Sequence, residues 1–382
     1  MAKTKSELIC AALSKITFFN EFVFDDLLYI ADNKQELELA DLIIELDKFV
    51  LVVQIKERNQ IFSSQEAEEK WMKKTIFDNA ISQLKVSIST LKNKKGLFFS
   101  NDYGQESTFN DKIVFPIVVF FNSSIKEYVR SYTSKSTGAK VNIFSFEDFE
   151  YMCNNILLPI ELLNYLEFRH KNLGNGIPDL LIFTDEQRVI LSSSPTAEKE
   201  KTSHEIIMFD FFREIYTDYA FVLSGDEIKS FKVNILGNFR KSMLVDNPQY
   251  RFILGKILIL SRRAVSTFIK FFYDSLAYAK EKKEYYRRVF MMDDVVFLFC
   301  TYTDWNTEFQ VLITDICRYR FKKKVCLSIH FFYRVDGLID INWIYNEEIW
   351  KQIVEYDKLL TSHDFWEGTT ERIIPNHNLI QF

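Results

Sequence analysis

The sequence predicts an α/β protein of two domains, and three observations carry this prediction. The chain has 382 residues, which is long for one compact domain. Short apolar segments with the β-branched content of strands alternate with longer segments of helical periodicity. Aromatic residues make up 16% of the chain while glycine and proline are scarce, so regular elements around large cores are expected rather than disorder.

The first half of the chain predicts a mixed sheet flanked by helices. Residues 41–56 read as a β-hairpin, because two apolar, β-branched runs flank the polar pair Asp47-Lys48. Pro116 lies inside a further expected strand, which is unusual because proline cannot donate to a sheet ladder. The other expected elements are a short strand near Phe22, strands at 113–121 and 141–144, and helices at 5–14, 64–91, 146–156 and 159–169.

A boundary is expected where Gly174, Gly176 and Pro178 interrupt the regular elements. We therefore assign residues 1–172 to the first domain, 173–203 to a linker that includes the polar stretch 192–203, and 204–382 to a second α/β (α+β) domain. In this second domain we expect helices at 204–216, 250–288 and 347–360, and strands at 221–223, 231–235, 295–301 and 325–332.

The hairpin permits a test of register. If Asp47 and Lys48 form the turn, Asp41 lies directly opposite Gln54, and Lys56 shares their face because strand side chains alternate. A four-residue turn gives the same pairing, whereas a three-residue turn would break it. Three polar groups are thus expected together at one end of an apolar hairpin.

This combination suits metal-assisted hydrolysis of phosphodiester bonds. A carboxylate can hold Mg²⁺, which keeps several waters and takes phosphate oxygens as further ligands. A nearby lysine can orient the attacking water or stabilise the negative charge that develops during the reaction. Asp41 and Lys56 are the candidates for these two roles.

Asp41, followed after twelve residues by Gln54-Ile55-Lys56, resembles the PD-(D/E)xK motif of restriction-endonuclease-like enzymes in its QxK variant. The resemblance covers about the first 120 residues. It implies a restriction-endonuclease-like mixed sheet in a nuclease domain at 1–172, with Asp41 and Gln54 as ligands of Mg²⁺ or Mn²⁺ and Lys56 as the catalytic lysine. It further implies Glu7, on the first helix, as an additional metal ligand and Gln83, on the following long helix, as an additional catalytic-site residue.

The sequence departs from the commonest motif at Gln54, which stands where most members have an acidic residue and brings no charge. Glu21 is a poorer candidate ligand than Glu7. Glu38 would fall on the opposite face of the hairpin if the strand began that early. For each of these glutamates, an ordinary solvated position is the competing interpretation.

Basic residues give candidate nucleic-acid contacts, although the net charge of −5 requires any such contact to be a local patch. Lys73, Lys74 and Lys85 lie on the expected long helix, and Arg262 and Arg263 belong to a basic segment at 240–288 that also contains tyrosines. A second basic run spans 318–324. Plain solubility is the alternative in each case.

Several other chemistries find no motif in the sequence. There is no GxxxxGK[ST] loop, no GxGxxG after a strand and no HExxH. The five cysteines are scattered without a CxxC pair, which suits free thiols in a reducing compartment. His330, in an apolar strand, is expected to be a satisfied core residue. Since no signal peptide and no run of about 18 apolar residues is evident, we expect a cytoplasmic protein without a membrane segment.

The sequence thus favours a metal-dependent endonuclease that acts on nucleic acid, with DNA preferred over RNA on the resemblance. Stand-alone bacterial proteins of this layout often act in restriction or anti-phage defence. The alternative is a catalytically inactive nuclease-like protein that binds nucleic acid or senses a signal, and a separate activity in the second domain is a third reading. A homo-oligomer, a protein partner and an activating signal all remain open.

Overall fold

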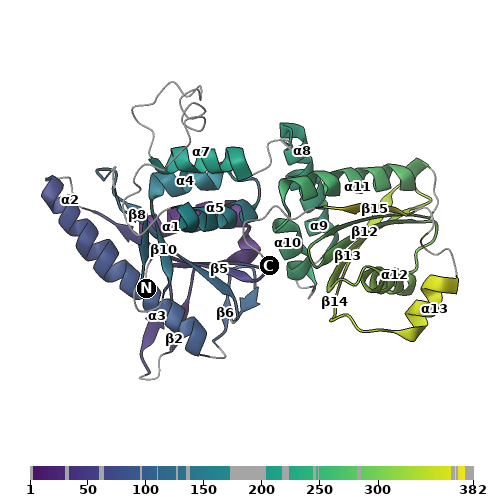
Figure 1. Cartoon of the computed structure of the whole chain (residues 1–382), viewed down its shortest axis with the longest axis horizontal. Coiled ribbons are helices and arrows are strands. Elements are labelled where there is room, and N and C mark those ends of the chain that lie inside the picture. Colours follow the sequence, from purple (N-terminus) through teal and green to yellow (C-terminus); the bar gives the residue numbers. More distant parts are fainter. Residues whose placement is uncertain are drawn as a thin grey trace. The chain divides into compact units, whose positions relative to one another are not determined.

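The computed structural model divides into two units, unit 1 (Met1–Tyr216) and unit 2 (Thr217–Phe382), shown in Figure 1. The structure describes all residues except 1–2, 31–33, 60–63, 95–96, 110, 126–127, 135–137, 173–203, 217–222, 244–246, 248, 282–284, 363–365, 367–368 and 375–382. The α/β class with a mixed sheet in the first half, and with a second sheet in the C-terminal half, is confirmed.

Unit 1 is built on a six-stranded sheet with the order β1-β4-β5-β8-β10-β9. The strand β5 runs parallel to β8, and β8 runs parallel to β10, whereas the other pairs are antiparallel. The strands are β1 Val23–Phe24, β4 Leu42–Leu46, β5 Phe49–Glu57, β8 Ile113–Phe121, β9 Ser131–Thr133 and β10 Lys140–Ser145. Two small ribbons accompany them, β2 Leu28–Ile30 with β3 Glu36–Glu38, and β6 Phe99–Ser100 with β7 Glu106–Ser107.

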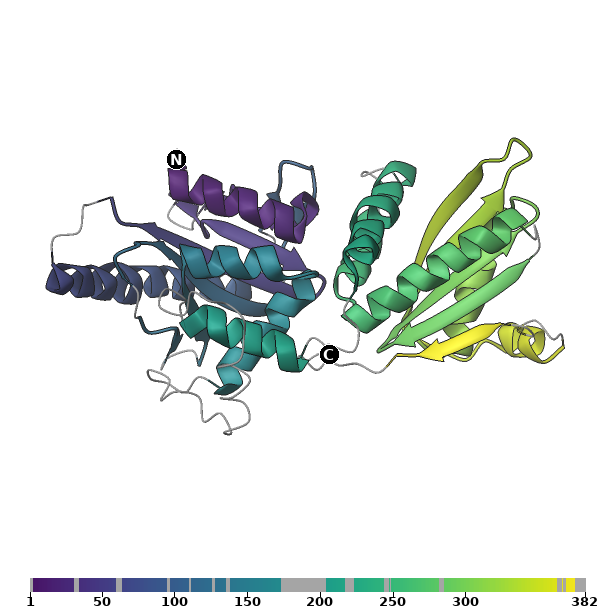
Figure 2. The ribbon, with the colours of Figure 1, turned by 90° about the horizontal axis from the view of Figure 1, so that it is seen from above.

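Helices cover both faces of this sheet (Figures 1 and 2). The helices of unit 1 are α1 Lys5–Phe18, η1 Asn20–Phe22, α2 Gln65–Trp71, η2 Met72–Ala80, α3 Ile81–Asn93, α4 Phe146–Asn155, α5 Pro159–Asn172 and α7 His204–Tyr216. α2, η2 and α3 form one continuous rod that Ser64 caps by accepting a hydrogen bond from the backbone N–H of Ala67. The rod packs on the face of Val50 and Val52, while α1 packs on the same hairpin and on α4.

Pro116 occupies a central strand without breaking its ladder. On β5, Val52 pairs with Pro116, but the pairing of β8 with β10 begins one residue later, at Ile117 opposite Asn142. The carbonyl of Pro116 accepts from Nδ2 of Asn142, so the ring nitrogen of Pro116 faces the same side, where no ladder hydrogen bond is required.

Unit 2 contains a five-stranded sheet with the order β14-β13-β12-β11-β15. Its strands are β11 Tyr286–Met292, β12 Val295–Tyr302, β13 Val325–Tyr333, β14 Ile339–Glu347 and β15 Thr370–Ile373. Its helices are α8 Gly225–Lys229, η4 Ser230–Ile235, α9 Leu236–Ser242, α10 Tyr250–Leu258, α11 Arg262–Glu281, α12 Thr307–Arg320 and α13 Val354–Ser362. α11 and α12 lie on opposite faces of the sheet (Figure 1).

An aromatic core fills the space between α11 and this sheet. The ring of Phe268 on α11 lies 6.0 Å from Phe297 and 5.2 Å from Phe299, both on β12. The alternate residues of β12 face α12, where Leu298 and Ile313 share a second core. The strand β12 is therefore apolar on both faces, as expected of a central strand.

Four predictions about unit 2 need correction. The helix α7 belongs to unit 1, so the boundary predicted at residue 204 moves to the end of α7. Residues 231–235 are helical, not a strand, because Phe231 and Ile235 are buried four residues apart whereas Val233 between them is exposed. The helix expected across 250–288 is two helices and the start of β11, and the one expected at 347–360 begins only at Val354. Most of the predicted strand 221–223 and all of 173–203 lie outside the described residues.

Over the described part of the chain, no helix is both long and apolar enough to cross a membrane.

Candidate active site on the β4–β5 hairpin

The β4–β5 hairpin has the predicted register. Leu46 pairs with Phe49 and Leu42 pairs with Val53, which places Asp41 opposite Gln54 at the next position. The turn residue Asp47 has a φ of 51°, a left-handed conformation that aspartate tolerates better than most residues. The predicted two-residue turn is therefore correct, and the resulting register determines which residues of the hairpin share a face.

Asp41, Gln54 and Lys56 are called here the hairpin triad, in which Lys56 lies within contact distance of the other two. Nζ of Lys56 donates to Oε1 of Gln54 at 3.2 Å and lies 3.7 Å from Oδ2 of Asp41. The backbone N–H of Ile55 also donates to Oδ2 of Asp41. The side chains of Asp41 and Lys56 are 9% and 19% exposed, so the ion pair is largely shielded from water.

Burial dominates the electrostatics of this site. It raises the pKa of Asp41 above its ordinary 3.8, and the nearby carboxylate of Glu7 adds to this, whereas Lys56 and the Ile55 N–H oppose it. Burial also raises the pKa of Glu38, with contributions from Asp41 and Glu7. Burial and neighbouring carboxylates thus raise the pKa of both Asp41 and Glu38, and Lys56 opposes the rise at both.

The position of Glu7 follows from the way α1 begins. Thr4 caps the helix, and the carboxylate of Glu7 accepts from the backbone N–H of Thr4 at 2.8 Å in a capping box. The neighbouring Ser6 donates to Glu57 at the end of β5 at 2.9 Å. This bond ties the first turn of α1 to the end of the hairpin and brings Glu7 into electrostatic contact with Asp41.

The oxygen donors of the triad suit a magnesium-type ion. Asp41 supplies a carboxylate and Gln54 an amide oxygen with a second lone pair, both hard ligands that leave room for water and phosphate oxygens. Within the described residues, no three His, Cys, Asp or Glu side chains lie together as metal ligands would. The fit therefore rests on Asp41 and Gln54, while Glu7, predicted as a ligand, is engaged in its capping box.

A scan of family models found none that matches the chain, and neither the curated proteins nor the solved structures gave a match. The resemblance to the PD-(D/E)xK enzymes therefore remains a prediction from the motif.

The other predicted site residues of unit 1 lie along the rod formed by α2, η2 and α3. Gln83 is exposed, and no hydrogen bond between described residues joins its side chain to the triad. Lys73 and Lys74 are exposed, and Nζ of Lys85 lies 5.6 Å from the ring centre of Tyr132.

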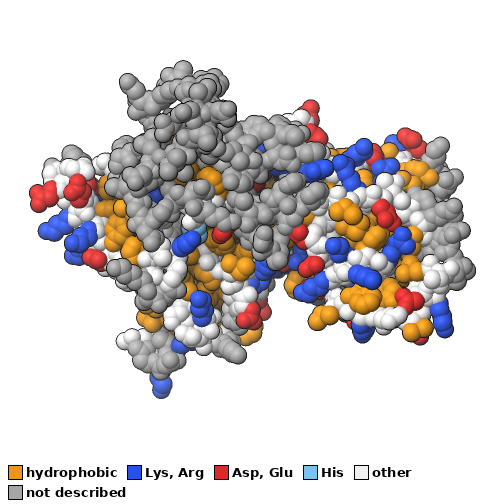
Figure 3. Space-filling model, viewed as in Figure 1, with side chains coloured by type: hydrophobic (Ala, Val, Ile, Leu, Met, Phe, Trp, Pro, Cys, Tyr) orange, Lys and Arg blue, Asp and Glu red, His pale blue; other side chains and the backbone are white. Residues whose placement is uncertain are grey.

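The basic candidates of unit 2 differ in their surroundings. Arg262 and Arg263 are half-buried in the first turn of α11. The run at 318–324 is extensively ion-paired, which favours a structural role; its pairs are Arg318 with Asp315 and Glu348, Arg320 with Glu371, and Lys324 with Glu347. Figure 3 likewise shows acidic and basic side chains interspersed over the described surface of unit 2.

His330 is the satisfied core residue that the sequence predicted. Its Nδ1 lies 2.8 Å from the hydroxyl of Tyr302 and its Nε2 lies 2.7 Å from the hydroxyl of Ser328. Although a serine beside a histidine resembles a nucleophile and its base, both side chains are fully buried, so no substrate can reach them.

The five cysteines are free and buried, as expected.

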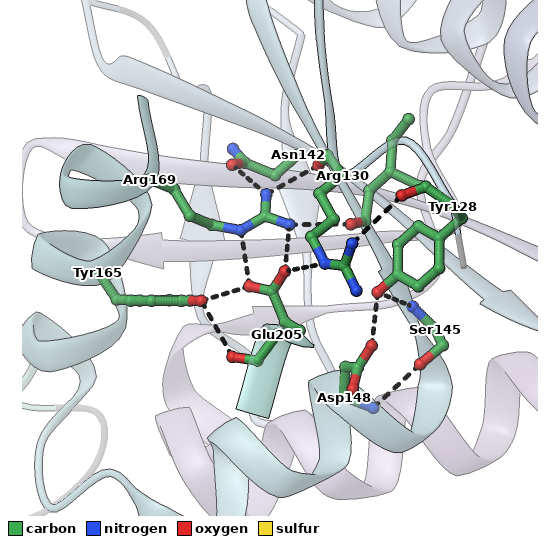
Figure 4. A network of polar contacts seen from close by, with 9 residues as sticks. Tyr128, Arg130, Asn142, Ser145, Asp148, Tyr165, Arg169 and Glu205 are labelled. Carbon is green, nitrogen blue, oxygen red and sulfur yellow. Dashed lines mark hydrogen bonds and ion pairs between the residues drawn. The ribbon is translucent and has the colours of Figure 1, made fainter. Parts of the chain in front are cut away.

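A buried ion network that was not predicted from the sequence joins α7 to the sheet of unit 1 (Figure 4). The carboxylate of Glu205 accepts from Nε and Nη2 of Arg169 at 2.7 and 2.8 Å, and Nε of Arg130 lies 3.3 Å away. Arg169 also donates to the side chain of Asn142 and to two backbone carbonyls. The only hint in the sequence is the charge of Arg169 among the apolar residues of α5.

Proposed function

We propose that unit 1 is a metal-dependent nuclease whose active site is the hairpin triad. The observation that carries this proposal is the contact of Lys56 with both Gln54 and Asp41 at one end of a buried hairpin. Asp41 and Gln54 would hold Mg²⁺ or Mn²⁺, and DNA is favoured over RNA on the resemblance alone. A cytoplasmic location and a part in antiviral defence belong to the same proposal.

Each residue of the triad has a separate task in phosphodiester hydrolysis. A bound divalent ion supplies stabilisation of the phosphate charge and a more acidic water. Asp41 provides the negative charge that retains the ion, and the Ile55 N–H fixes the direction of its carboxylate. Lys56 can donate to the attacking water or to a phosphate oxygen, and its burial strengthens that interaction because water screens it less.

A second candidate function is binding of nucleic acid without cleavage. Gln54 favours it, because this residue brings no charge to the second ligand position, and so does the burial that raises the pKa of Asp41. In this case the fold would be kept while the hydrolytic activity is lost.

A cleavage assay separates these functions. Double-stranded DNA, single-stranded DNA and RNA would be incubated with the full chain in Mg²⁺, in Mn²⁺ and in EDTA. We expect metal-dependent cutting that falls by about 10²-fold or more in Asp41→Asn and in Lys56→Met. The matched control is Lys48→Ala, a lysine in the turn at the other end of the same hairpin. Cutting that survives both triad variants would refute the assignment, and binding without cutting would support the second function.

A further inference from the structure

Units 1 and 2 share an order of elements around their central strands, apart from the short strands β1 to β3, β6 and β7, which occur only in unit 1. In unit 1, α1 precedes the antiparallel hairpin β4–β5, and the rod of α2 to α3 leads to β8, parallel to β5. In unit 2, α11 precedes the antiparallel hairpin β11–β12, and α12 leads to β13, parallel to β12. In each unit the helix after the hairpin packs on one face of the sheet, and the helix before it lies on the other (Figure 1).

The turns of the two hairpins share unusual details. Asp47 and Asp293 are the first turn residues, and both have a φ of 51°. The carbonyl of each accepts a hydrogen bond from a lysine just before the parallel strand, Lys112 in unit 1 and Lys323 in unit 2. Agreement at the level of turn conformation and its lysine contact is more specific than a shared order of elements.

Because the two turns have the same length and conformation, counting from them identifies the residues of unit 2 that are equivalent to the hairpin triad. Asp41 lies six residues before its turn aspartate, as Arg287 does in unit 2. Gln54 corresponds in the same way to Cys300, which pairs directly with Arg287 across the hairpin. Lys56 corresponds to Tyr302.

The chemistry at these positions is opposite to that of unit 1. A guanidinium replaces the carboxylate of Asp41, and burial raises the pKa of the Cys300 thiol to about 12, so this thiol does not ionise near neutral pH. The Arg287 guanidinium lies 4.9 Å from the ring centre of Tyr285 and 4.8 Å from that of Trp366. Arg287 is 7% exposed, so its charge disfavours a metal cation at this position and attracts an anion at the nearby surface only through space.

Two exposed aromatic rings flank this position at the carboxyl ends of β12 and β13. Tyr285, 38% exposed, lies 5.4 Å from the ring of Tyr302 at the end of β12. Trp305, 43% exposed, lies 5.9 Å from the ring of Phe332, the residue that pairs with Tyr302. Exposed aromatic rings beside a cation are the features that bind single-stranded nucleic acid, because bases stack on the rings.

We propose that residues 262–333 form a second, non-catalytic copy of the core of unit 1, and that this copy binds a single strand of nucleic acid. Bases stack on Tyr285 and Trp305, and the charge of the buried Arg287 behind these rings favours the approach of the phosphate backbone. The choice of nucleic acid as ligand rests on the function proposed for unit 1, whereas the repeated core and the exchange of carboxylate for guanidinium do not.

The test is binding of a fluorescein-labelled oligothymidylate to the full chain in EDTA, followed by fluorescence anisotropy. We expect Tyr285→Ala and Trp305→Ala each to weaken binding by roughly tenfold, the effect of losing one stacked base. Both side chains are exposed, so neither change should unfold unit 2, which circular dichroism would verify. The matched control is Phe252→Ala, an aromatic residue 57% exposed that stacks on Tyr345, near the opposite end of β13.

The outcomes separate this inference from the function of unit 1. Binding that is weakened by the two edge variants, unchanged by Phe252→Ala and retained in Asp41→Asn supports the inference whether or not the chain cuts nucleic acid. If the wild-type chain does not bind the strand, or if the edge variants bind as tightly as the wild type, the inference is overturned. Metal-dependent cutting that is lost in Asp41→Asn would still support the nuclease in that case.

Discussion

Removal of the Glu205 carboxylate should destabilise unit 1 more than any other single change to α7. Glu205 and Arg169 have no exposed side-chain surface, and Arg130 has 3%. In Glu205→Ala, two buried guanidinium groups lose their shared anion, and breaking a buried ion pair in this way costs about 3–5 kcal/mol. The hydroxyl of Tyr165 also loses its closer acceptor and keeps only the backbone carbonyl of residue 205 at 3.5 Å, which adds at most about 1 kcal/mol.

These two terms share atoms and do not add fully, so we expect a loss of about 4 kcal/mol or more. That is a large part of the roughly 5–15 kcal/mol by which natural domains are stable. Native-state hydrogen exchange in increasing urea, read by mass spectrometry, would measure the loss, because it reports on the amides of each unit separately. The amides of unit 2 should keep their protection.

The matched control is Asp210→Ala on the same helix. Asp210 accepts from the hydroxyl of Tyr151, and its side chain is 41% exposed, so its loss should cost less than about 1 kcal/mol. Replacement of Arg130, Arg169 and Glu205 together by apolar residues should cost less than Glu205→Ala alone, because no charge is then left unpaired. An effect of Glu205→Ala no larger than that of Asp210→Ala would show that the buried ion network does not stabilise unit 1.

Three further predictions concern titratable and metal-binding groups. Burial raises the folded-state pKa of Asp41 above its ordinary 3.8, so the ionised carboxylate destabilises the folded state as pH rises from 3.8 through the folded-state pKa. Asp41→Asn should therefore raise the Tm of unit 1 at neutral pH, whereas Asp47→Asn should leave it unchanged. Gln54→Glu adds a charge at the second ligand position, so the Mg²⁺ concentration for half-maximal activity should fall by about tenfold or more. An unchanged concentration would show that residue 54 does not face the ion. Burial lowers the pKa of His330 from 6.5 to about 3, so the folded state binds fewer protons and unit 2 should lose stability as pH falls through this range, by up to about 1.4 kcal/mol per pH unit. Urea unfolding at several pH values should show a flatter dependence in His330→Gln, and an unchanged slope would contradict the prediction.

Local patterns predicted the hairpin well. Its register follows from the period of two along a strand and from the polar turn, so Asp41 and Gln54 could be paired without a structure. The helix α12 was not predicted, because three polar residues, Gln310, Thr314 and Arg318, are buried beside its apolar ones and interrupt the usual apolar pattern.

Contacts between residues far apart in the chain could not be predicted from the sequence. Arg169 and Glu205 are separated by a segment that carries no pattern linking them, and only the packing of α7 on unit 1 brings them together. The same packing moved the boundary between the units, because His204 follows a polar stretch that was expected to end the linker. A polar stretch marks a loop but does not show on which domain the next helix packs.

The most direct test of the central claim is the single-turnover rate of cleavage of the preferred nucleic acid as a function of Mg²⁺ concentration. We expect saturable dependence on the metal in the wild type and in Lys48→Ala. We expect a loss of about 10²-fold or more in Asp41→Asn and in Lys56→Met, with folding verified by circular dichroism. A rate that is independent of metal, or that both triad variants retain, would contradict the assignment of the active site to the hairpin triad.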